Sequence, residues 1–288
     1  MKNSYRNAKM FAIFLVSVLV LGLAACGAPA SSSGSQRSVL RVGVECACAP
    51  FNWTQMDDSY GAMPLDDGTF AGGYDVEIAK LIAEAMDMDL QIVKIDWDGL
   101  IPALTSEKID AIIADMSPTE DRKQTIDFSD IYYKSDLVIV VRTDSPYVDA
   151  TSLDDFDGAK LTGQLGTLLY EVLDQIPGVD KQSAAENHPE MIIATVSGRV
   201  DGYVCERPNA ISASMTNPEL TFVSFTPENG FNYDGTDVSI AVGLRKGDPL
   251  KDQINAALAT ISEETRLQLM EQCIQNHLAL VESGATED

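Results

Sequence analysis

The chain has 288 residues, of which 45% are hydrophobic, and its formal net charge at neutral pH is -24. This length suits one large domain or two smaller ones, and the hydrophobic content is enough for a packed core. The negative charge argues against binding to nucleic acid or to anionic lipid, both of which attract basic surfaces. It is compatible with collecting cationic or zwitterionic small molecules, although most of the acids are expected to form a solvated surface.

The N-terminus carries the features of an export signal. A basic start is followed by an uncharged apolar run over 10–24, and the tetrapeptide Leu23-Ala24-Ala25-Cys26 closes this run. The run is shorter than the ~20 apolar residues that a membrane-spanning helix needs, and is typical of a signal-peptide core. We therefore predict a signal peptide over 1–25. An ordinary cleaved signal and an uncleaved membrane anchor are the alternatives to a lipoprotein signal.

The closing tetrapeptide resembles the bacterial lipobox, in which the cysteine is lipidated and becomes the first mature residue. Cys26 is therefore the expected lipidation site, and acyl chains buried at about 0.8 kcal/mol per CH₂ would tether the protein stably. The segment that follows is rich in Gly, Ser and Pro and has no apolar periodicity, which is typical of a flexible coil. Residues 26–38 are predicted to be the lipidated cysteine and its tether, and the rest of the chain is expected to be extracytoplasmic.

Beyond the tether, short apolar runs alternate with segments of helical periodicity. The helix that follows Asp75 has its apolar residues on one face, and Asp75 can serve as its N-cap. Thr119 is a suitable cap for a short helix carrying Arg122. The other elements expected in this half are strands over 39–44, 90–93 and 109–114 and a short helix around Leu100.

The alternation continues in the second half, where the apolar run over 137–141 predicts a buried strand. The other elements expected here are a helix over 167–173, strands near Lys160 and over 202–205 and 238–242, and a long terminal helical region over 250–275. Such alternation implies α/β layers built around mostly parallel sheets.

Four cysteines remain besides the lipidation site: Cys46, Cys48, Cys205 and Cys273. Four thiols allow three full pairings, and the sequence does not choose among them. Cys46 and Cys48 would point to one face of a strand, and their spacing is too short for a Cys-x-x-Cys redox or zinc motif. The two histidines are isolated in the sequence. No metal, cofactor or catalytic Ser/His or Cys/His group is therefore expected.

A family resemblance is carried by four segments, LRVGVECACAPFNW, GGYDVEIAKLIAEAM, DWDGLIPALTSEKIDAIIADMSPTEDRKQTIDFSDIYY and DVSIAVGLRKGDPL, in this order. Together they resemble the extracellular solute-binding proteins of amino-acid ABC transporters, the family of the polar and basic amino-acid receptors. The resemblance covers roughly residues 39–280. It implies an α/β, two-lobe fold of the type II periplasmic-binding-protein class, with two hinge crossover strands and the ligand between the lobes.

The resemblance also implies a division of the chain and a set of partners. Lobe 1 is expected over 39–131 and again over 237–288, lobe 2 over 137–236, and the hinge over 132–136. The expected ligand is an amino acid, and the expected protein partners are the permease subunits of an ABC importer. Ligand contact with both lobes would favour a closed form that the permease recognises. A monomer is implied, attached to the membrane only by its lipid.

The resemblance places ligand contacts at nine positions. Arg122 matches the arginine that holds the ligand carboxylate, and its planar fork suits bidentate recognition; a surface ion pair on the helix is the alternative. Glu206 falls where the family has an aspartate for the α-amino group, and is longer by one methylene. Trp97 matches an apolar wall and Thr167 a helix N-terminus facing the carboxylate. The remaining positions are Glu45, Cys48, Asp115, Ser117 and Gln164.

Departures from the family pattern bear on the ligand. Cys48 occupies the position of a ring that stacks on the ligand in many relatives, so one stacking face is lost. Asp115 replaces a glycine or serine, and Glu45 matches an acid that faces the ligand side chain in the basic-amino-acid members. Because an unpaired buried charge is costly, these two acids favour a cationic ligand: lysine, arginine, ornithine or histidine. A polar neutral or a sulfur amino acid is the main alternative.

Two further expectations complete the interpretation. The segment 54–70 is longer than the family usually has and carries four aspartates, so we expect a mobile acidic loop near the mouth of the cleft. The same fold also serves dehydratase-type enzymes and surface adhesins. Since nothing in the sequence demands a catalytic acid or base, we predict a receptor rather than an enzyme.

Overall fold

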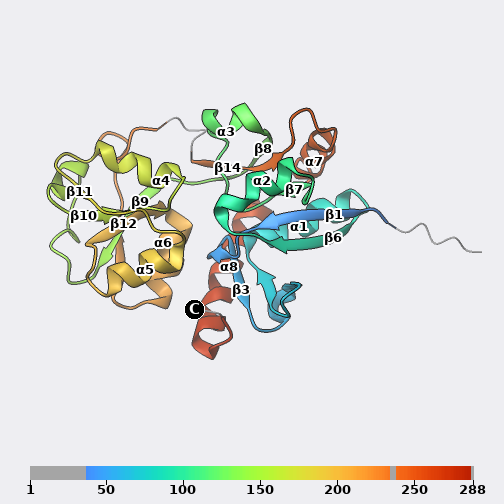
Figure 1. Cartoon of the computed structure of the whole chain (residues 1–288). Helices are drawn as coiled ribbons and strands as arrows, with labels where there is room; N and C mark the ends of the chain where they lie inside the picture. The colour runs from blue at the N-terminus through green and yellow to red at the C-terminus, as the bar shows by residue number, and fades with distance from the viewer. Residues whose placement is uncertain (1–36, 234–237, 287–288) are drawn as a thin grey trace, which may run out of the picture. The chain divides into compact units, whose positions relative to one another are not determined.

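The computed structural model describes residues 37–233 and 238–286. These residues form two mixed five-stranded sheets and one four-stranded antiparallel sheet, with helices packed around them (Figure 1). The predicted signal peptide and lipidation site lie outside the described residues. In the described part of the chain, no helix has the length and apolarity needed to cross a membrane.

The first sheet has the strand order β6-β1-β7-β14-β8. Its first three strands pair in parallel, whereas β14 runs antiparallel to both of its neighbours. Its strands are β1 (Val39–Val44), β6 (Asp89–Lys94), β7 (Ala111–Ile112), β8 (Asp127–Lys134) and β14 (Ser239–Leu244). The helices of the same body are α1 (Tyr74–Ala85), α2 (Leu100–Thr105), α3 (Glu120–Thr125), α7 (Leu250–Leu258) and α8 (Glu263–Ser283).

The second sheet has the strand order β11-β10-β12-β9-β13. β10 pairs in parallel with β11 and β12, and β9 pairs antiparallel with β12 and β13. Its strands are β9 (Leu137–Arg142), β10 (Lys160–Thr162), β11 (Asp180–Lys181), β12 (Gly202–Glu206) and β13 (Leu220–Val223). Its helices are α4 (Leu168–Glu171), α5 (His188–Val196) and α6 (Arg207–Thr216).

The third sheet is a small antiparallel one attached to the first body, with the order β2-β3-β5-β4. Its strands are β2 (Ala47–Cys48), β3 (Asn52–Gln55), β4 (Met63–Pro64) and β5 (Phe70–Gly72). Most of the acidic segment 54–70 is turn and irregular structure, as expected of a loop, and only residues 54–55, 63–64 and 70 belong to the strands of this sheet. Its aspartates serve the turns, since Asp57 accepts a hydrogen bond from the backbone of Ser59 and Asp67 accepts one from the backbone of Thr69.

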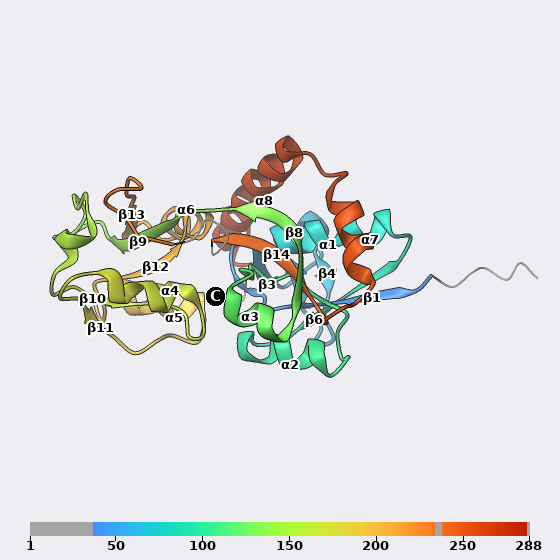
Figure 2. The ribbon, with the colours of Figure 1, turned by 90° about the horizontal axis from the view of Figure 1, so that it is seen from above.

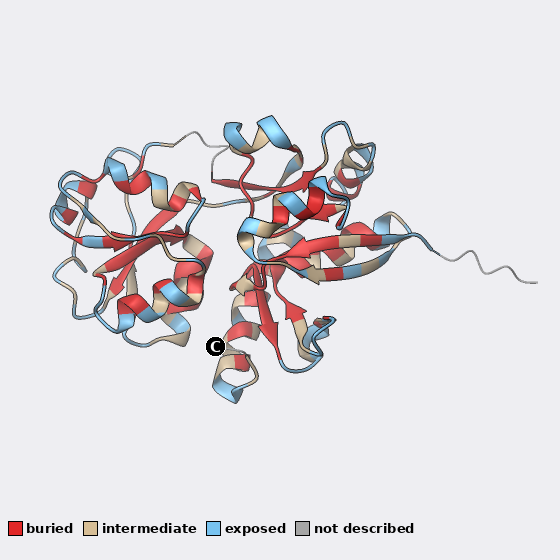
Figure 3. Cartoon of the chain, viewed as in Figure 1, coloured by how far each residue is buried: buried red, intermediate tan, exposed pale blue. Residues whose placement is uncertain are grey.

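Each of the two large sheets has its own hydrophobic core, and we call the bodies lobe 1 and lobe 2. The core of lobe 1 includes β1, α1, α7 and α8, and that of lobe 2 includes β9, β10 and β12. Figure 3 shows that the strands at the centre of each lobe are buried. The chain passes from lobe 1 to lobe 2 between β8 and β9, and returns between β13 and β14 (Figure 2). The exact lobe and hinge boundaries remain predictions.

Most of the predicted elements form, with three departures. Of the strand expected over 109–114, only Ala111–Ile112 pairs as a strand, although the flanking apolar residues are buried. The terminal helical region is two helices, because Ser262 caps a new one. The helix expected over 167–173 is a single α turn followed by a 3-10 helix over Val172–Gln175. The sheets are also mixed rather than mostly parallel.

Asp75 is not the N-cap of α1, which begins after Gly73. Gly73 has φ 121, and a Cβ atom there would lie 2.3 Å from the carbonyl oxygen of Phe51, so the close approach of these two segments requires glycine. Asp75 lies in the first turn with its carboxyl group turned into the core, where it accepts hydrogen bonds from the Tyr132 hydroxyl at 2.6 Å and the Asn52 amide at 2.8 Å. Burial raises the pKa of Asp75 to about 7.

Substitution of Tyr132 by Phe should lower the free energy of unfolding by about 1–3 kcal/mol, because a buried oxygen of Asp75 loses its donor. Urea denaturation measures this change. Tyr133→Phe is the matched control, since the Tyr133 hydroxyl makes no hydrogen bond within the described residues. Equal effects of the two substitutions would contradict the role assigned to the Tyr132–Asp75 bond.

Candidate binding cleft

All nine side chains predicted to contact a ligand line one small cavity between the lobes, with a volume of about 20 Å³. The segments that carry them are far apart in the sequence and belong to both lobes. Lobe 1 contributes Glu45, Cys48, Trp97, Asp115, Ser117 and Arg122, and lobe 2 contributes Gln164, Thr167 and Glu206. Their contact with a ligand remains a prediction, but the fold does bring them together.

These side chains lie at the edges of the two sheets where the strands end. Glu45 directly follows β1, Asp115 follows β7, Gln164 follows β10, and Glu206 is the last residue of β12. In an open α/β sheet, ligands bind in the crevice outside the carboxyl ends of the strands. Thr167 is the N-cap of α4, so its position at the start of a helix is as expected.

Direct hydrogen bonds join the lobes across this cavity. The Gln164 amide donates to Glu45 Oε1 at 2.8 Å, and Arg122 donates to the Gly166 carbonyl at 3.1 Å. Nearby, the Asn209 amide donates to the Ala49 carbonyl at 3.0 Å. The remaining space is enough for roughly one water molecule. The lobes must therefore separate, or these bonds must exchange, to admit anything larger.

Arg122 is held by carbonyl groups and an aromatic ring instead of a carboxylate. Its guanidinium donates to the Ser117 carbonyl at 2.9 Å and lies 5.0 Å from the centre of the Trp97 ring. Burial lowers the pKa of Arg122 to about 10, so the group stays cationic at neutral pH. Within the described ranges Arg122 forms no ion pair, and the alternative of a surface pair on the helix is wrong. Its fork can exchange carbonyl oxygens for an incoming carboxylate.

Three carboxyl groups of the cavity have raised pKa values, mainly because burial disfavours their charged form. Burial raises the pKa of Glu45 to about 7, against the opposing effect of the Gln164 hydrogen bond, and it raises the pKa of Glu206 to about 7. The pKa of Asp115 lies well above its usual range, first because of burial and next because of the neighbouring Glu206. The cavity thus concentrates acids without a matching set of bases.

Two of these acids keep an oxygen without any hydrogen-bond partner. These atoms are Asp115 Oδ1 and Glu206 Oε2, both buried. The other oxygen of Asp115 accepts a hydrogen bond from the Cys48 thiol at 3.3 Å. Because an unsatisfied buried acceptor is unfavourable, a cationic donor placed between the two free oxygens would be stabilised.

The four described cysteines are buried and form no disulfide with one another. Cys46 has a positive φ of 60 and precedes β2, so it does not share a strand face with Cys48 as expected. No group of three or more His, Cys, Asp or Glu side chains in the described ranges is arranged to hold a metal ion.

His188 lines the same cavity and was not predicted. It is the first residue of α5, is buried, and packs edge-on against the Tyr203 ring with 6.4 Å between ring centres. Burial lowers its pKa to about 4, and its Nε2 atom has no hydrogen-bond partner. The flanking Asn187 and Pro189 signal a helix start in the sequence, but no sequence pattern shows that this helix faces the other lobe.

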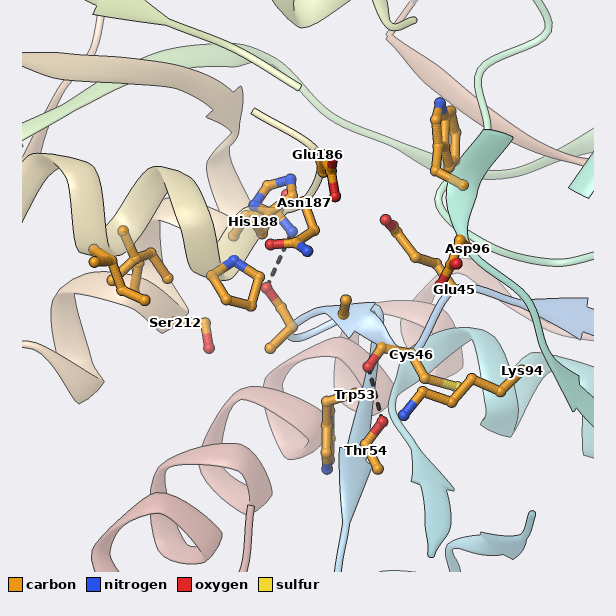
Figure 4. A pocket seen from close by; sticks show the side chains of 18 of the residues that line it. Glu45, Cys46, Trp53, Thr54, Lys94, Asp96, Glu186, Asn187, His188 and Ser212 are labelled. Carbon is orange, nitrogen blue, oxygen red and sulfur yellow. Dashed lines mark hydrogen bonds between the residues drawn. The ribbon is translucent and has the colours of Figure 1, made fainter. Parts of the chain in front are cut away.

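A much larger cavity, of about 800 Å³, adjoins the small one (Figure 4). Both cavities are lined by Glu45, Trp97 and His188. Side chains from both lobes line the large cavity, including Trp53 from lobe 1 and Tyr203 from lobe 2.

The family described as bacterial extracellular solute-binding proteins, family 3, matches residues 40–275. The arginine-binding extracellular protein ArtP of Bacillus subtilis (strain 168) is 26% identical over 265 residues, which cover 90% of this chain and 95% of ArtP.

Solved structures show the same two-lobe arrangement. An ancestral arginine-binding protein bound to arginine is 31% identical, with a TM-score of 0.67, and covers 82% of this chain and 98% of its own. The ancestral amino-acid-binding protein AncCDT-1, described as a precursor of cyclohexadienyl dehydratase, is 28% identical, with a TM-score of 0.67, and covers 82% of this chain and 96% of its own. The predicted fold class is confirmed.

Asp115 has a positive φ of 52, a left-handed conformation that glycine adopts without strain and alanine does not. Asp115→Gly should therefore be more stable to unfolding than Asp115→Ala by about 0.5–1 kcal/mol, after allowance for the greater freedom of unfolded glycine. Both variants lack the carboxyl group, so its effect cancels. Urea unfolding checks the difference.

The exposed helical residue Gln272 provides the control, since there Gln272→Gly should be less stable than Gln272→Ala by about 1 kcal/mol. The same order of stability at both positions would refute the strain assigned to Asp115.

Proposed function

The chain belongs to family 3 of the bacterial extracellular solute-binding proteins, and we propose that it is an amino-acid receptor of an ABC importer, with a cationic amino acid as its ligand. The ligand would bind between the lobes, in contact with both, and the closed complex would be recognised by the permease subunits. The receptor itself needs no cofactor for this function.

The observation that carries the proposal is the pair of unpartnered acid oxygens in a cavity between two lobes. Asp115 Oδ1 and Glu206 Oε2 have no hydrogen-bond partner, and Glu45 adds a third acid to the same cavity. An α-ammonium group would satisfy the pair. A second cation on the ligand side chain would neutralise Glu45, which accepts a hydrogen bond from the neutral Gln164.

The carboxylate of the ligand has a matching partner on the other side of the cavity. Arg122 presents a cationic guanidinium held by carbonyl groups, and Thr167, the N-cap of the short helix α4, lines the same cavity. A zwitterion thus finds a cation and an anion in one cavity. The arginine named for ArtP and for the ancestral protein supports a basic side chain.

Location and attachment follow from the same proposal. The apolar run and the small-small-cysteine junction at the N-terminus support a signal peptide over 1–25, lipidation of Cys26, and a tether that holds the receptor outside the cytoplasmic membrane. The receptor would act as a monomer that meets the permease at the membrane surface.

One other class of function has a specific observation in its favour. AncCDT-1 is described as a precursor of a dehydratase, and the carboxyl groups of Glu45 and Glu206 have pKa values of about 7, in the range that suits a general acid or base. A cleft enzyme of the dehydratase type would change its ligand chemically, whereas a receptor returns it unchanged.

Calorimetric titration tests the proposal. The protein is unfolded and refolded to remove any carried ligand, and then titrated with the proteinogenic amino acids and ornithine. Lysine, arginine, ornithine or histidine should bind, and Glu45→Gln should weaken that binding by about 10–100-fold, because a charged hydrogen bond is lost. Glu219→Gln, at an exposed position of lobe 2, is the control and should leave the affinity unchanged.

The outcomes separate the alternatives. Binding of neutral or sulfur amino acids alone would reject the cationic ligand and keep the receptor. The Arg122→Gln variant is expected to lose binding of every amino acid, because all of them carry the α-carboxylate. Recovery of a converted product would favour the enzyme, and absence of binding by all amino acids would reject the amino-acid receptor.

The affinity for a cationic amino acid should rise with pH. The pKa values of Glu45 and Glu206 are about 7 in the ligand-free protein, so these groups carry protons at pH 5.5 and must release them to pair with a cation. We expect affinity to increase at least about tenfold from pH 5.5 to pH 8, with proton release on binding. His188, with a pKa of about 4, does not change charge in this range.

Titrations in buffers of different ionisation enthalpy measure the released protons. Glu45→Gln should reduce both the proton release and the pH dependence. Binding without proton release at pH 6.5 would contradict the protonation assigned to these acids.

A further inference from the structure

The large cavity offers far more space than a free amino acid needs. Its volume of about 800 Å³ lies within the ~300–1,000 Å³ of pockets that enclose drug-sized ligands. The groups that suit an α-carboxylate and an α-amine, Arg122, Thr167, Asp115 and Glu206, line the small cavity alone. The large cavity is therefore left for some other part of a ligand.

The two cavities form a continuous path. Glu45, Trp97 and His188 line both of them. A ligand whose α-carboxylate reaches Arg122 and whose α-amine reaches Glu206 would pass its side chain between these three residues. The end of a long side chain would then enter the large cavity.

The lobe 2 wall of the large cavity holds polar groups that no protein atom satisfies. His188, Tyr203 and Asn209 all line it, and they are 4%, 0% and 1% exposed. Yet His188 Nε2, the Tyr203 hydroxyl and Asn209 Oδ1 have no hydrogen-bond partner. Most buried polar atoms in proteins do have one, so three unpartnered atoms in the side chains of one wall indicate a partner that binds when the lobes separate.

The charges around the large cavity restrict that partner. Four acids, Glu45, Asp96, Asp98 and Glu186, line it together with one lysine, Lys94. Figure 4 shows Glu45 and Asp96 on one side of the cavity and Glu186 and His188 on the other. The excess of acids favours a cationic or neutral group rich in hydrogen-bond donors and disfavours a second carboxylate.

We propose that the ligand is an α-amino acid with a side chain longer than that of lysine, ending in amine or amide donors, and that the large cavity is the subsite for this end group. This proposal rests on the amino-acid receptor function. The subsite proposal goes beyond the receptor function because it assigns the large cavity, and not Glu45 alone, to the ligand side chain.

Titration of the full-length protein with three probes tests the assignment. L-lysine carries the α-groups that the residues of the small cavity would bind once the lobes separate. Nε-(L-lysyl)-L-lysine adds a cationic donor-rich end group, and Nε-(γ-L-glutamyl)-L-lysine adds an end group of similar length with a second carboxylate. We expect the lysyl probe to bind at least about tenfold more tightly than L-lysine, since it gains charged hydrogen bonds. The glutamyl probe should bind more weakly than the lysyl probe.

Two variants localise the end group. Tyr203→Phe removes only the hydroxyl group. It should weaken binding of the lysyl probe by about 3–10-fold and leave the affinity for L-lysine unchanged. Tyr147→Phe, at a half-buried tyrosine of lobe 2 outside both cavities, is the control and should change neither affinity. Ile192→Trp places a larger side chain at a half-buried position of the large cavity and should abolish binding of the lysyl probe while retaining that of L-lysine.

The results distinguish this proposal from the receptor function. If L-lysine or another free amino acid binds and the lysyl probe binds no more tightly, the large-cavity subsite is overturned and the receptor stands. If both variants weaken the two ligands equally, the subsite is overturned as well. If neither the probes nor any free amino acid binds, both proposals fall.

Discussion

A buried carboxyl group without a counter-charge is unfavourable, and the cleft of this protein depends on that constraint. Glu45, Asp115 and Glu206 lie at or just beyond the ends of three different strands and line one cavity with Arg122. Without a ligand cation, their charge is reduced by protonation, and the lobes are held by hydrogen bonds such as that from Gln164 to Glu45. The same acids that favour a cation therefore make the ligand-free site sensitive to protons.

The two-lobe architecture makes this arrangement possible. Each lobe has its own core, so the lobes can separate without exposing either of them. The cleft residues lie at the carboxyl ends of strands that the cores hold in place. The contacts between lobes are hydrogen bonds across the cleft together with the packing of α6 against α8, where Ser212 and His277 are hydrogen-bonded. Closure around a ligand can then replace carbonyl and amide partners by ligand groups, while the cores remain packed.

Features that depend on interactions between residues close in sequence could be predicted, and features that depend on contacts between distant segments could not. The apolar runs at 39–44 and 137–141 formed the strands expected, and Thr119 caps its helix through a contact three residues away. The prediction that Asp75 is the N-cap of α1 is wrong, because its hydrogen-bond partners, Asn52 and Tyr132, are distant in sequence. The acidic segment 54–70 consists mostly of the turns expected of a loop, but the strand pieces within it are only one or two residues long, and such pieces are recognised by their pairing rather than by a pattern.

The sequence by itself determined the α/β alternation, the family and the identity of nine of the residues that line the small cavity, since these depend on local patterns and on a resemblance residue by residue. Only the tertiary structure decided that the oxygens of Asp115 and Glu206 lack partners, that His188 joins them, and that a large cavity continues from the small one. Burial, hydrogen-bond satisfaction and empty volume are properties of segments brought together from both lobes, and no local pattern encodes them.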